Sequence, residues 1–121
     1  MSEARLLLVE DEDDLRMLVG EALRLLGFSA VPVSDGVAAV AALERERFDV
    51  VVSDVSMPNG MSGIDLAAHA ARLQPHARII LASGYARAQL PPLPPNVVFL
   101  PKPYRIAQLA ELLREQQAVS G

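Results

Sequence analysis

The stretch F-D-V-V-V-S-D-V-S-M-P, residues 48–58, decides how this chain folds. Its centre, residues 50–52, is a continuous run of valines, which is typical of a strand buried on both faces. The run leads to the carboxylate of Asp54, and burying a charge without a partner is energetically expensive. We therefore expect the rest of the chain to supply groups that meet Asp54.

Length and composition limit the class of protein. The chain has 121 residues, enough for one domain, and 51% of them are hydrophobic, enough for a core. The net charge of −4 argues against nucleic-acid binding, and the absence of cysteine excludes disulfides and thiolate chemistry. No apolar stretch approaches the roughly 20 residues that span a membrane. We expect a single cytoplasmic domain, residues 1–121, with neither membrane nor nucleic acid as a partner.

Short apolar stretches alternate with amphipathic ones along the chain. Strands are predicted at residues 6–9, 29–33, 50–52, 78–82 and 97–100. Helices are predicted at residues 37–47, 64–73 and 106–117, and before Gly27, where Leu15, Leu18, Val19, Ala22 and Leu26 recur at helical spacing. This alternation predicts an α/β fold with a five-stranded parallel sheet that helices cover on both faces.

Prolines modify two of these elements. Pro32 lies inside the second strand, and because proline cannot donate to a sheet, we expect that strand at an edge. Four prolines among residues 86–96 leave room for no more than a turn or two of helix. We therefore expect a shortened, proline-rich fourth helix within an irregular connection.

Polar residues follow four of the five predicted strands. Glu10 and Asp11 follow the first, Asp54 ends the third, Ser83 ends the fourth and Lys102 follows the fifth. In a parallel sheet of this kind, ligands bind outside the carboxyl ends of the strands. We therefore expect these five side chains to meet at one edge of the sheet.

The acids after the first strand also have a second interpretation. Residues 10–14 are five acids in a row, which is typical of a helix N-terminus, where Asp13 or Asp14 could cap the helix. This interpretation accounts for the later acids better than for Glu10 and Asp11, which follow the strand directly. Both interpretations stay open at this point.

The expected set of side chains suits phosphoryl chemistry. Carboxylates this close cannot all stay ionised without a cation, and a hard oxygen-binding ion such as Mg²⁺ is the natural choice. A carboxylate can act as the nucleophile toward a phosphoryl group. Lys102 could neutralise the developing charge, and the Ser83 hydroxyl could donate to a phosphate oxygen.

Four motifs resemble those of response-regulator receiver domains, the CheY-like domains of two-component signalling. They are L-L-L-V-E-D-E-D-D-L-R, V-V-S-D-V-S-M-P, L-A-S-G and P-K-P-Y, in that order across nearly the whole chain. The resemblance implies a doubly wound, flavodoxin-like (βα)5 sandwich and a phosphorylation-dependent signalling switch. It also implies a histidine kinase or histidine phosphotransfer protein as phosphodonor and a further protein as output partner.

The resemblance implies a role for each matching residue around the metal. Asp54 would be the phosphoacceptor and, with Asp11 and the backbone carbonyl of Ser56, would bind Mg²⁺. Glu10 would help through a water molecule. Lys102 would pair with the phosphoryl group, and the peptide bond from Lys102 to Pro103 would be cis.

Further positions match the switching and rate-tuning residues of the family. Ser83 would be the hydroxyl that moves toward the phosphoryl group, and Phe99 resembles the aromatic switch residue, with core packing as the alternative. Ser56 and Tyr85 occupy the two positions that tune autodephosphorylation, with a plain surface role as the alternative. Tyr104 is expected to pack at the start of the last helix.

The sequence departs from the usual receiver pattern in the loop after Asp54 and in the fourth helix. The loop M-P-N-G-M-S-G is one residue longer than the commonest form and resembles loops of receivers attached to hybrid histidine kinases. Because the fourth helix belongs to the output face in this family, its shortening puts the usual partner geometry in question. The opening residues and short tail favour a stand-alone receiver over one excised from a larger protein.

Two other function classes remain open. One is a Mg²⁺-dependent phosphatase with an aspartate nucleophile, but such enzymes typically carry a second acid two residues later, where this chain has Ser56. The other is a vestigial receiver that serves only as an interaction module. The retention of Asp11, Asp54, Ser83 and Lys102 argues against it. We expect a signalling switch rather than an enzyme.

Overall fold

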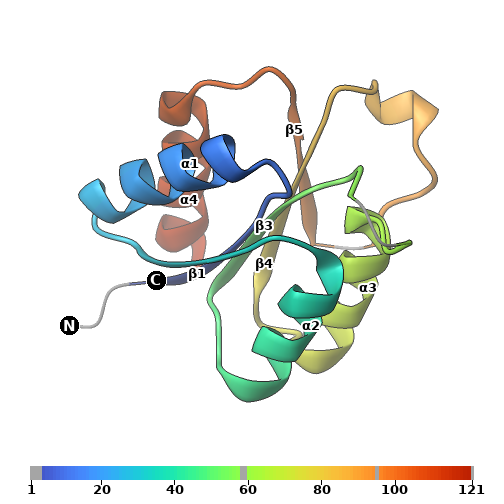
Figure 1. Ribbon diagram of the computed structural model, residues 1–121, viewed down its shortest axis with the longest axis horizontal. Coiled ribbons are helices and arrows are strands. Elements are labelled where there is room, and N and C mark those ends of the chain that lie inside the picture. The colour runs from blue at the N-terminus through green and yellow to red at the C-terminus, as the bar shows by residue number, and fades with distance from the viewer. Residues whose placement is uncertain (1–3, 58–59, 95, 121) are drawn as a thin grey trace.

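A computed structural model describes residues 4–57, 60–94 and 96–120 (Figure 1). None of the helices in these ranges is long and apolar enough to cross a membrane. The elements follow one another as β1 (Arg5–Val9), α1 (Asp13–Leu25), β2 (Ser29–Val33), α2 (Gly36–Arg45), β3 (Val50–Asp54), α3 (Gly63–Leu73), β4 (Arg78–Ser83), η1 (Arg87–Gln89), β5 (Val97–Pro101) and α4 (Ile106–Ser120).

The five strands form one parallel sheet in the order β2-β1-β3-β4-β5. This order is typical of flavodoxin-like doubly wound folds. The prediction that the strand with Pro32 lies at an edge is confirmed, because β2 pairs only with β1. The central position of β3 explains why it reads as an unbroken apolar run.

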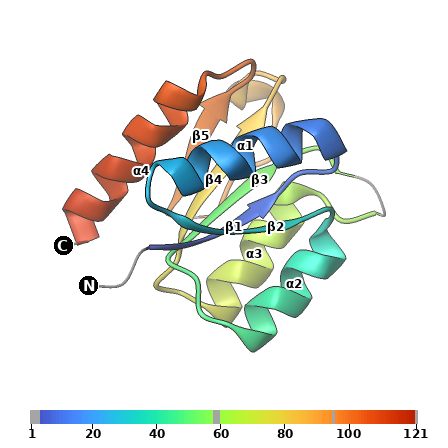
Figure 2. The same cartoon turned by 60° about the vertical axis from the view of Figure 1, so that its left-hand side comes forward.

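Helices cover both faces of the sheet, α1 and α4 one face and α2 and α3 the other (Figure 2). Successive residues of a strand point to opposite faces, so β3 contributes to two separate cores. Val51 packs with Phe48 and Leu66 on the side of α2 and α3. Val50 and Val52 belong to the core under α1 and α4. The prediction that β3 is buried on both faces is confirmed.

Helix α1 differs from its prediction in how it begins and in which face it buries. Its N-cap is Glu12, whose side chain makes no capping hydrogen bond, so neither Asp13 nor Asp14, the two candidates of the helix-start interpretation, caps the helix. Leu18 is 62% exposed and Leu26 is 46% exposed, although both fit the helical spacing. Helical spacing indicates a helix but does not select its buried face, because several faces of this helix carry leucine.

The predicted fourth helix is replaced by a much smaller element. Within the described residues between β4 and β5, a three-residue 3-10 helix, η1, stands in its place and contains no proline. The prolines come after it, where the lack of a backbone N–H and the ring clash with the preceding turn exclude an α-helix. Leu90 and Leu93 pack from this connection against the core on the side of α2 and α3.

Candidate functional site

The register of the sheet brings the predicted side chains to one edge. Val9 pairs with Ser53 across β1 and β3, so Glu10 follows beside Asp54. Asp54 in turn pairs with Ala82 of β4. Ser83 pairs with Pro101 at the last rung between β4 and β5, so Lys102 follows immediately. Sheet order and register thus place residues from four strands within reach of one another.

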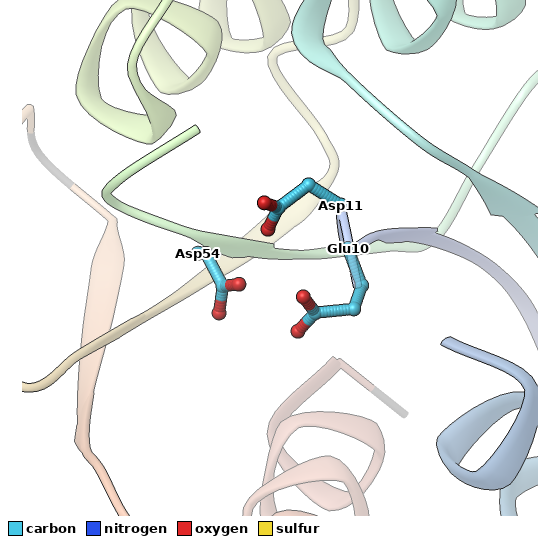
Figure 3. A group of neighbouring side chains, drawn as sticks. All are labelled: Glu10, Asp11 and Asp54. Atoms are coloured by element: carbon cyan, nitrogen blue, oxygen red, sulfur yellow. The ribbon is translucent and has the colours of Figure 1, made fainter. Parts of the chain in front are cut away.

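Three carboxylates converge at this edge. Oxygens of Glu10, Asp11 and Asp54 all lie within 4.8 Å of one another (Figure 3). Asp54 and Glu10 are buried, whereas Asp11 is exposed at the mouth of the cluster. Burial strengthens the repulsion between the carboxylates, because little water is present to screen their charges.

Lys102 lies against two of these acids. Its Nζ is 2.7 Å from Oδ1 of Asp54 and 4.0 Å from Oε1 of Glu10. Burial by itself lowers the pKa of the Lys102 ammonium, but Asp54, Glu10 and Asp11 outweigh it and raise the pKa above its usual range. The peptide bond between Lys102 and Pro103 is cis, as the resemblance implies.

Glu10 has the strongest electrostatic perturbation among these acids. Burial, reinforced by the neighbouring Asp54 carboxylate, raises its pKa to about 7. The backbone N–H of Glu12, which donates to Oε2 at 3.1 Å, and the charge of Lys102 oppose this rise without cancelling it. Arg16 holds the backbone on the other side by donating to the Glu10 carbonyl at 3.0 Å.

The donor set fits a hard divalent cation. All three converging groups offer carboxylate oxygens, which are the ligands that Mg²⁺ prefers. One ammonium is present for three acids, so the cluster retains negative charge that a cation would neutralise. The pKa of Glu10 is raised chiefly by burial, and the neighbouring Asp54 carboxylate adds to this rise.

Ser83 joins the ends of β4 and β5 at the same edge. Its side chain is buried, and its hydroxyl oxygen accepts a hydrogen bond of 2.9 Å from the backbone N–H of Tyr85. Its carbonyl accepts a hydrogen bond of 2.8 Å from the backbone N–H of Lys102. Because the hydroxyl accepts in this arrangement, its proton remains able to donate to a further group.

Comparisons with known proteins agree with this arrangement. The sequence pattern described as the response regulator receiver domain matches residues 6–114. The chain belongs to the response regulator receiver domain family. The receiver is 32% identical over 108 residues to the response regulator receiver protein CpdR of Brucella abortus (strain 2308), covering 87% of this chain and 89% of CpdR.

Two further relatives extend the comparison. The receiver is 38% identical over 117 residues to the sensor kinase CckA of Brucella abortus (strain 2308), covering 93% of this chain but only 12% of the kinase. It also resembles the crystal structure of the response regulator TrrA from Thermotoga maritima in complex with Mg²⁺-BeF. The TM-score is 0.82 at 27% identity, with 93% of this chain and 98% of TrrA covered.

The other predicted residues of the receiver lie around the cluster rather than in it. Ser56 follows β3, and its side chain is exposed. Tyr85, two residues after Ser83, is 59% exposed. Phe99 is half-buried on β5 and lines a surface pocket with Pro101 and residues of α4. The structure brings none of these three side chains into the acid cluster.

Sequence reasoning missed a groove beside the acid cluster. It has a volume of about 430 Å³ and lies between α1, the residue after β4 and the segment that joins β5 to α4. The number of leucines on α1 was the signal in the sequence that could have indicated this groove. A helix that buries only one face needs fewer leucines than α1 carries. The lining residues are Leu15, Leu18, Val19, Gly84, Lys102, Pro103, Tyr104 and Ile106.

Tyr104 packs against the core under α1 and α4, as predicted for the start of the last helix. The structure adds that the pKa of its phenol is perturbed. Burial raises the pKa of Tyr104 to about 12, and the charges of Asp54 and Glu10 contribute to this rise. Its phenol therefore stays protonated near neutral pH, and Tyr104 is one of the residues that line the groove.

Proposed function

We propose that this receiver is a phosphorylation-dependent signalling switch that accepts a phosphoryl group on Asp54 with Mg²⁺ bound. A histidine kinase or a histidine phosphotransfer protein would be the donor. The observation that carries this proposal is the position of Asp54, a buried carboxylate 2.7 Å from the Lys102 ammonium and within 4.8 Å of two further acids. This arrangement supports the proposal, because the chemistry needs a carboxylate, a positive charge and oxygen ligands close together.

Mg²⁺ would be held by Asp11, Asp54 and the backbone carbonyl of Ser56, with Glu10 acting through water. When bound, the ion would supply positive charge to the oxygens of the phosphoryl group. A carboxylate oxygen of Asp54 attacks phosphorus, the bond from phosphorus to the donor breaks, and the leaving atom keeps its electron pair. Lys102 holds its charge beside the new phosphoryl oxygens throughout.

Phosphorylation would be read by the groups that face Asp54. The phosphoryl group adds negative charge, which attracts the Lys102 ammonium and the Ser83 hydroxyl proton. The direct backbone hydrogen bond between these two residues couples the end of β4 to the end of β5. A shift there changes the populations of two surface conformations that include Phe99 and the start of α4, and a protein partner would bind one of them. Ser56 and Tyr85 border the site and would tune the lifetime of the phosphoryl group.

A protein donor also suits the groove next to Lys102. The groove is lined by apolar side chains of α1, and Leu18 at its edge is 62% exposed. The donor has to bring its phosphohistidine to Asp54, so its surface must lie over the elements that border the acid cluster. Exposed apolar side chains at that place would contribute to binding by losing contact with water.

The test is the intact mass of the protein after incubation with Mg²⁺ and a small phosphodonor such as phosphoramidate. We expect one added phosphoryl group on the wild type and none on Asp54→Asn. Asp14→Asn is the matched control, because Asp14 is an exposed acid outside the cluster, and it should gain one phosphoryl group like the wild type.

Other outcomes would contradict the proposal in distinguishable ways. Addition to Asp54→Asn as well would show that the acceptor is another residue. No addition to the wild type, from either the small donor or a phosphorylated phosphotransfer protein, would favour a vestigial receiver that acts only as an interaction module. Turnover of a generic phosphate ester would favour an aspartate-nucleophile phosphatase.

A further inference from the structure

The loop between β3 and α3 rests on the first residue of α2. Gly36 opens α2 and is buried, and the side chain of Met61 lies directly over it. A Cβ on Gly36 would come within 2.6 Å of the Met61 sulfur and within 3.1 Å of the Met61 Cβ. Only glycine therefore allows Met61 to lie where it does.

The same loop is attached to β3 at both of its ends. At one end, the sulfur of Met57 lies 3.5 Å from the hydroxyl oxygen of Ser53. At the other end, the backbone N–H of Gly63 donates to the Val55 carbonyl at 2.7 Å, and a Cβ on Gly63 would lie 2.0 Å from the Asp54 carbonyl oxygen. The contact of Met61 with Gly36 connects this loop to a different element, helix α2.

We infer that Gly36 and Met61 are positioning residues for the metal site, because their contact sets where the β3–α3 loop lies relative to Asp54. This inference rests on the proposed function, in which the Ser56 carbonyl of this loop binds Mg²⁺. Both methionines of the loop pack against the core on the side of α2 and α3. The described part of the loop is therefore held by apolar contacts on that side of the sheet.

The expected effect of Gly36→Ala depends on which atoms of Met61 the added Cβ would meet. A clash with the sulfur alone could be relieved by rotating the end of a flexible side chain. The Met61 Cγ at 2.9 Å and Cβ at 3.1 Å are also too close, so Met61 has to shift by a few tenths of an ångström at the base of its side chain. Metal–oxygen distances tolerate only about ±0.2 Å, so a small movement of the loop matters.

The experiment compares Mg²⁺ affinity in four proteins, namely the wild type, Gly36→Ala, Met61→Ala and the double variant. Affinity is measured by Mg²⁺ titration followed by amide chemical shifts, which requires no phosphorylation. We expect Gly36→Ala alone to weaken Mg²⁺ binding by about 10-fold, within the range seen when groups that orient ligands are changed. In the Met61→Ala background, the same substitution should cause a clearly smaller loss, because the sulfur and Cγ that it would meet at 2.6 and 2.9 Å are gone and only the Cβ contact at 3.1 Å remains.

Gly20→Ala is the matched control. Gly20 is also a buried helical glycine, but an added Cβ there would meet only Leu8 at 3.9 Å, which is ordinary contact. This variant should bind Mg²⁺ like the wild type. Melting temperatures without metal show whether any variant has lost its fold, and alanine inside a helix should itself favour the helix by roughly 1 kcal/mol over glycine.

Each alternative result has one meaning. Unchanged Mg²⁺ affinity in Gly36→Ala would overturn the positioning role while leaving the proposed function intact. An equal loss in the presence and absence of the Met61 side chain would also overturn it, because the effect would not pass through Met61. No Mg²⁺ binding by the wild type would overturn the proposed function and this inference with it.

Discussion

At the scale of single residues, the main feature of the site is that negatively charged side chains outnumber positively charged ones at the strand ends. Lys102 is the only lysine in the sequence, and its Nζ lies against two of three clustered carboxylates. The cluster therefore keeps excess negative charge, and the pKa of its buried acid Glu10 is raised, chiefly by burial and further by Asp54. The site therefore favours the binding of a cation, because the side chains of the protein do not neutralise this negative charge.

The pH dependence of stability should reveal the cost of burying the Glu10 carboxylate. The pKa of Glu10 is raised from 4.5 to about 7 in the folded protein, chiefly by burial. A proton held there stabilises the fold fully below the unfolded pKa, and this contribution is lost as the pH rises through the folded pKa. In metal-free buffer, Glu10→Gln should therefore be more stable than the wild type by about 1–3 kcal/mol near pH 8, with the difference vanishing toward about pH 4.

Thermal unfolding of both proteins across this pH range checks the expectation. Taking the difference between the wild type and Glu10→Gln removes the contribution of the titrating groups that both proteins share. A constant difference between them at all pH values would show that the charge of Glu10 does not carry the effect. Addition of Mg²⁺ near neutral pH should narrow the difference, because a bound cation stabilises ionised acids.

Lys102 should matter for chemistry more than for metal binding. Lys102→Ala removes the ammonium 2.7 Å from Asp54 but leaves the three carboxylates in place. We expect Mg²⁺ affinity to stay largely intact and phosphorylation of Asp54 to slow by about 100-fold, as when one preorganised electrostatic group is removed. Mg²⁺ titration and the rate of mass increase measure the two effects separately. A collapse of metal binding would mean that the lysine is misassigned.

At the scale of elements, the helix termini around the site are unequally fixed. Helix α3 begins with a capping box, in which the Ser62 hydroxyl accepts from the Asp65 N–H and the Asp65 carboxylate accepts from the Ser62 N–H, both at 3.1 Å. Helix α1 lacks a side-chain cap, and its first-turn acids Asp13 and Asp14 act through the helix dipole. The loop on which the proposed metal site depends thus ends at a firmly capped helix.

Removing this cap should destabilise the fold without touching the acids. Ser62→Ala should lower the free energy of unfolding by about 1 kcal/mol, the usual contribution of an N-cap serine. Denaturant unfolding measures the change, and Ser34→Ala is the control, because Ser34 is exposed and lies in a bend outside the helices. Equal stabilities of the two variants would mean that the capping box contributes little.

The elements also show where sequence patterns succeed and where they fail. The five strands and the helices α2 and α3 lie within two residues of their predicted bounds, because apolar runs and turn residues are local signals. The buried face of α1 was not predictable in the same way. Leu18 and Leu26 share the helical spacing of Val19, and the packing of the sheet and α4 decides which of them is covered.

At the scale of the whole molecule, one buried glutamine ties distant segments together. Gln74, the C-cap of α3, accepts a hydrogen bond of 2.8 Å from the Phe48 N–H. It donates to the carbonyls of Leu43 at 2.8 Å and Glu46 at 2.6 Å. The end of α2, the approach to β3 and the end of α3 therefore meet at a single side chain, at the opposite end of β3 from Asp54.

Replacing this glutamine should be costly. Gln74→Leu introduces an apolar side chain of similar size and leaves three backbone groups without their side-chain partner. We expect a loss of about 2–4 kcal/mol in the free energy of unfolding, because buried polar groups without hydrogen bonds are strongly unfavourable. Gln108→Leu, at an exposed position that accepts only from the Arg105 N–H, should lose less than about 1 kcal/mol. Similar losses in both variants would contradict the role of Gln74.

The sequence by itself determined the order of strands and helices along the chain, the edge position of the strand with Pro32, and the polar residues that follow four of the five strands. These follow from local patterns of hydrophobicity, proline and charge, which need no knowledge of distant contacts. Only the tertiary structure decided that Lys102 lies 4.0 Å from Glu10, that Gly36 supports Met61, and that part of α1 stays exposed. Such contacts join segments far apart in the chain, so sheet order, register and packing determine them.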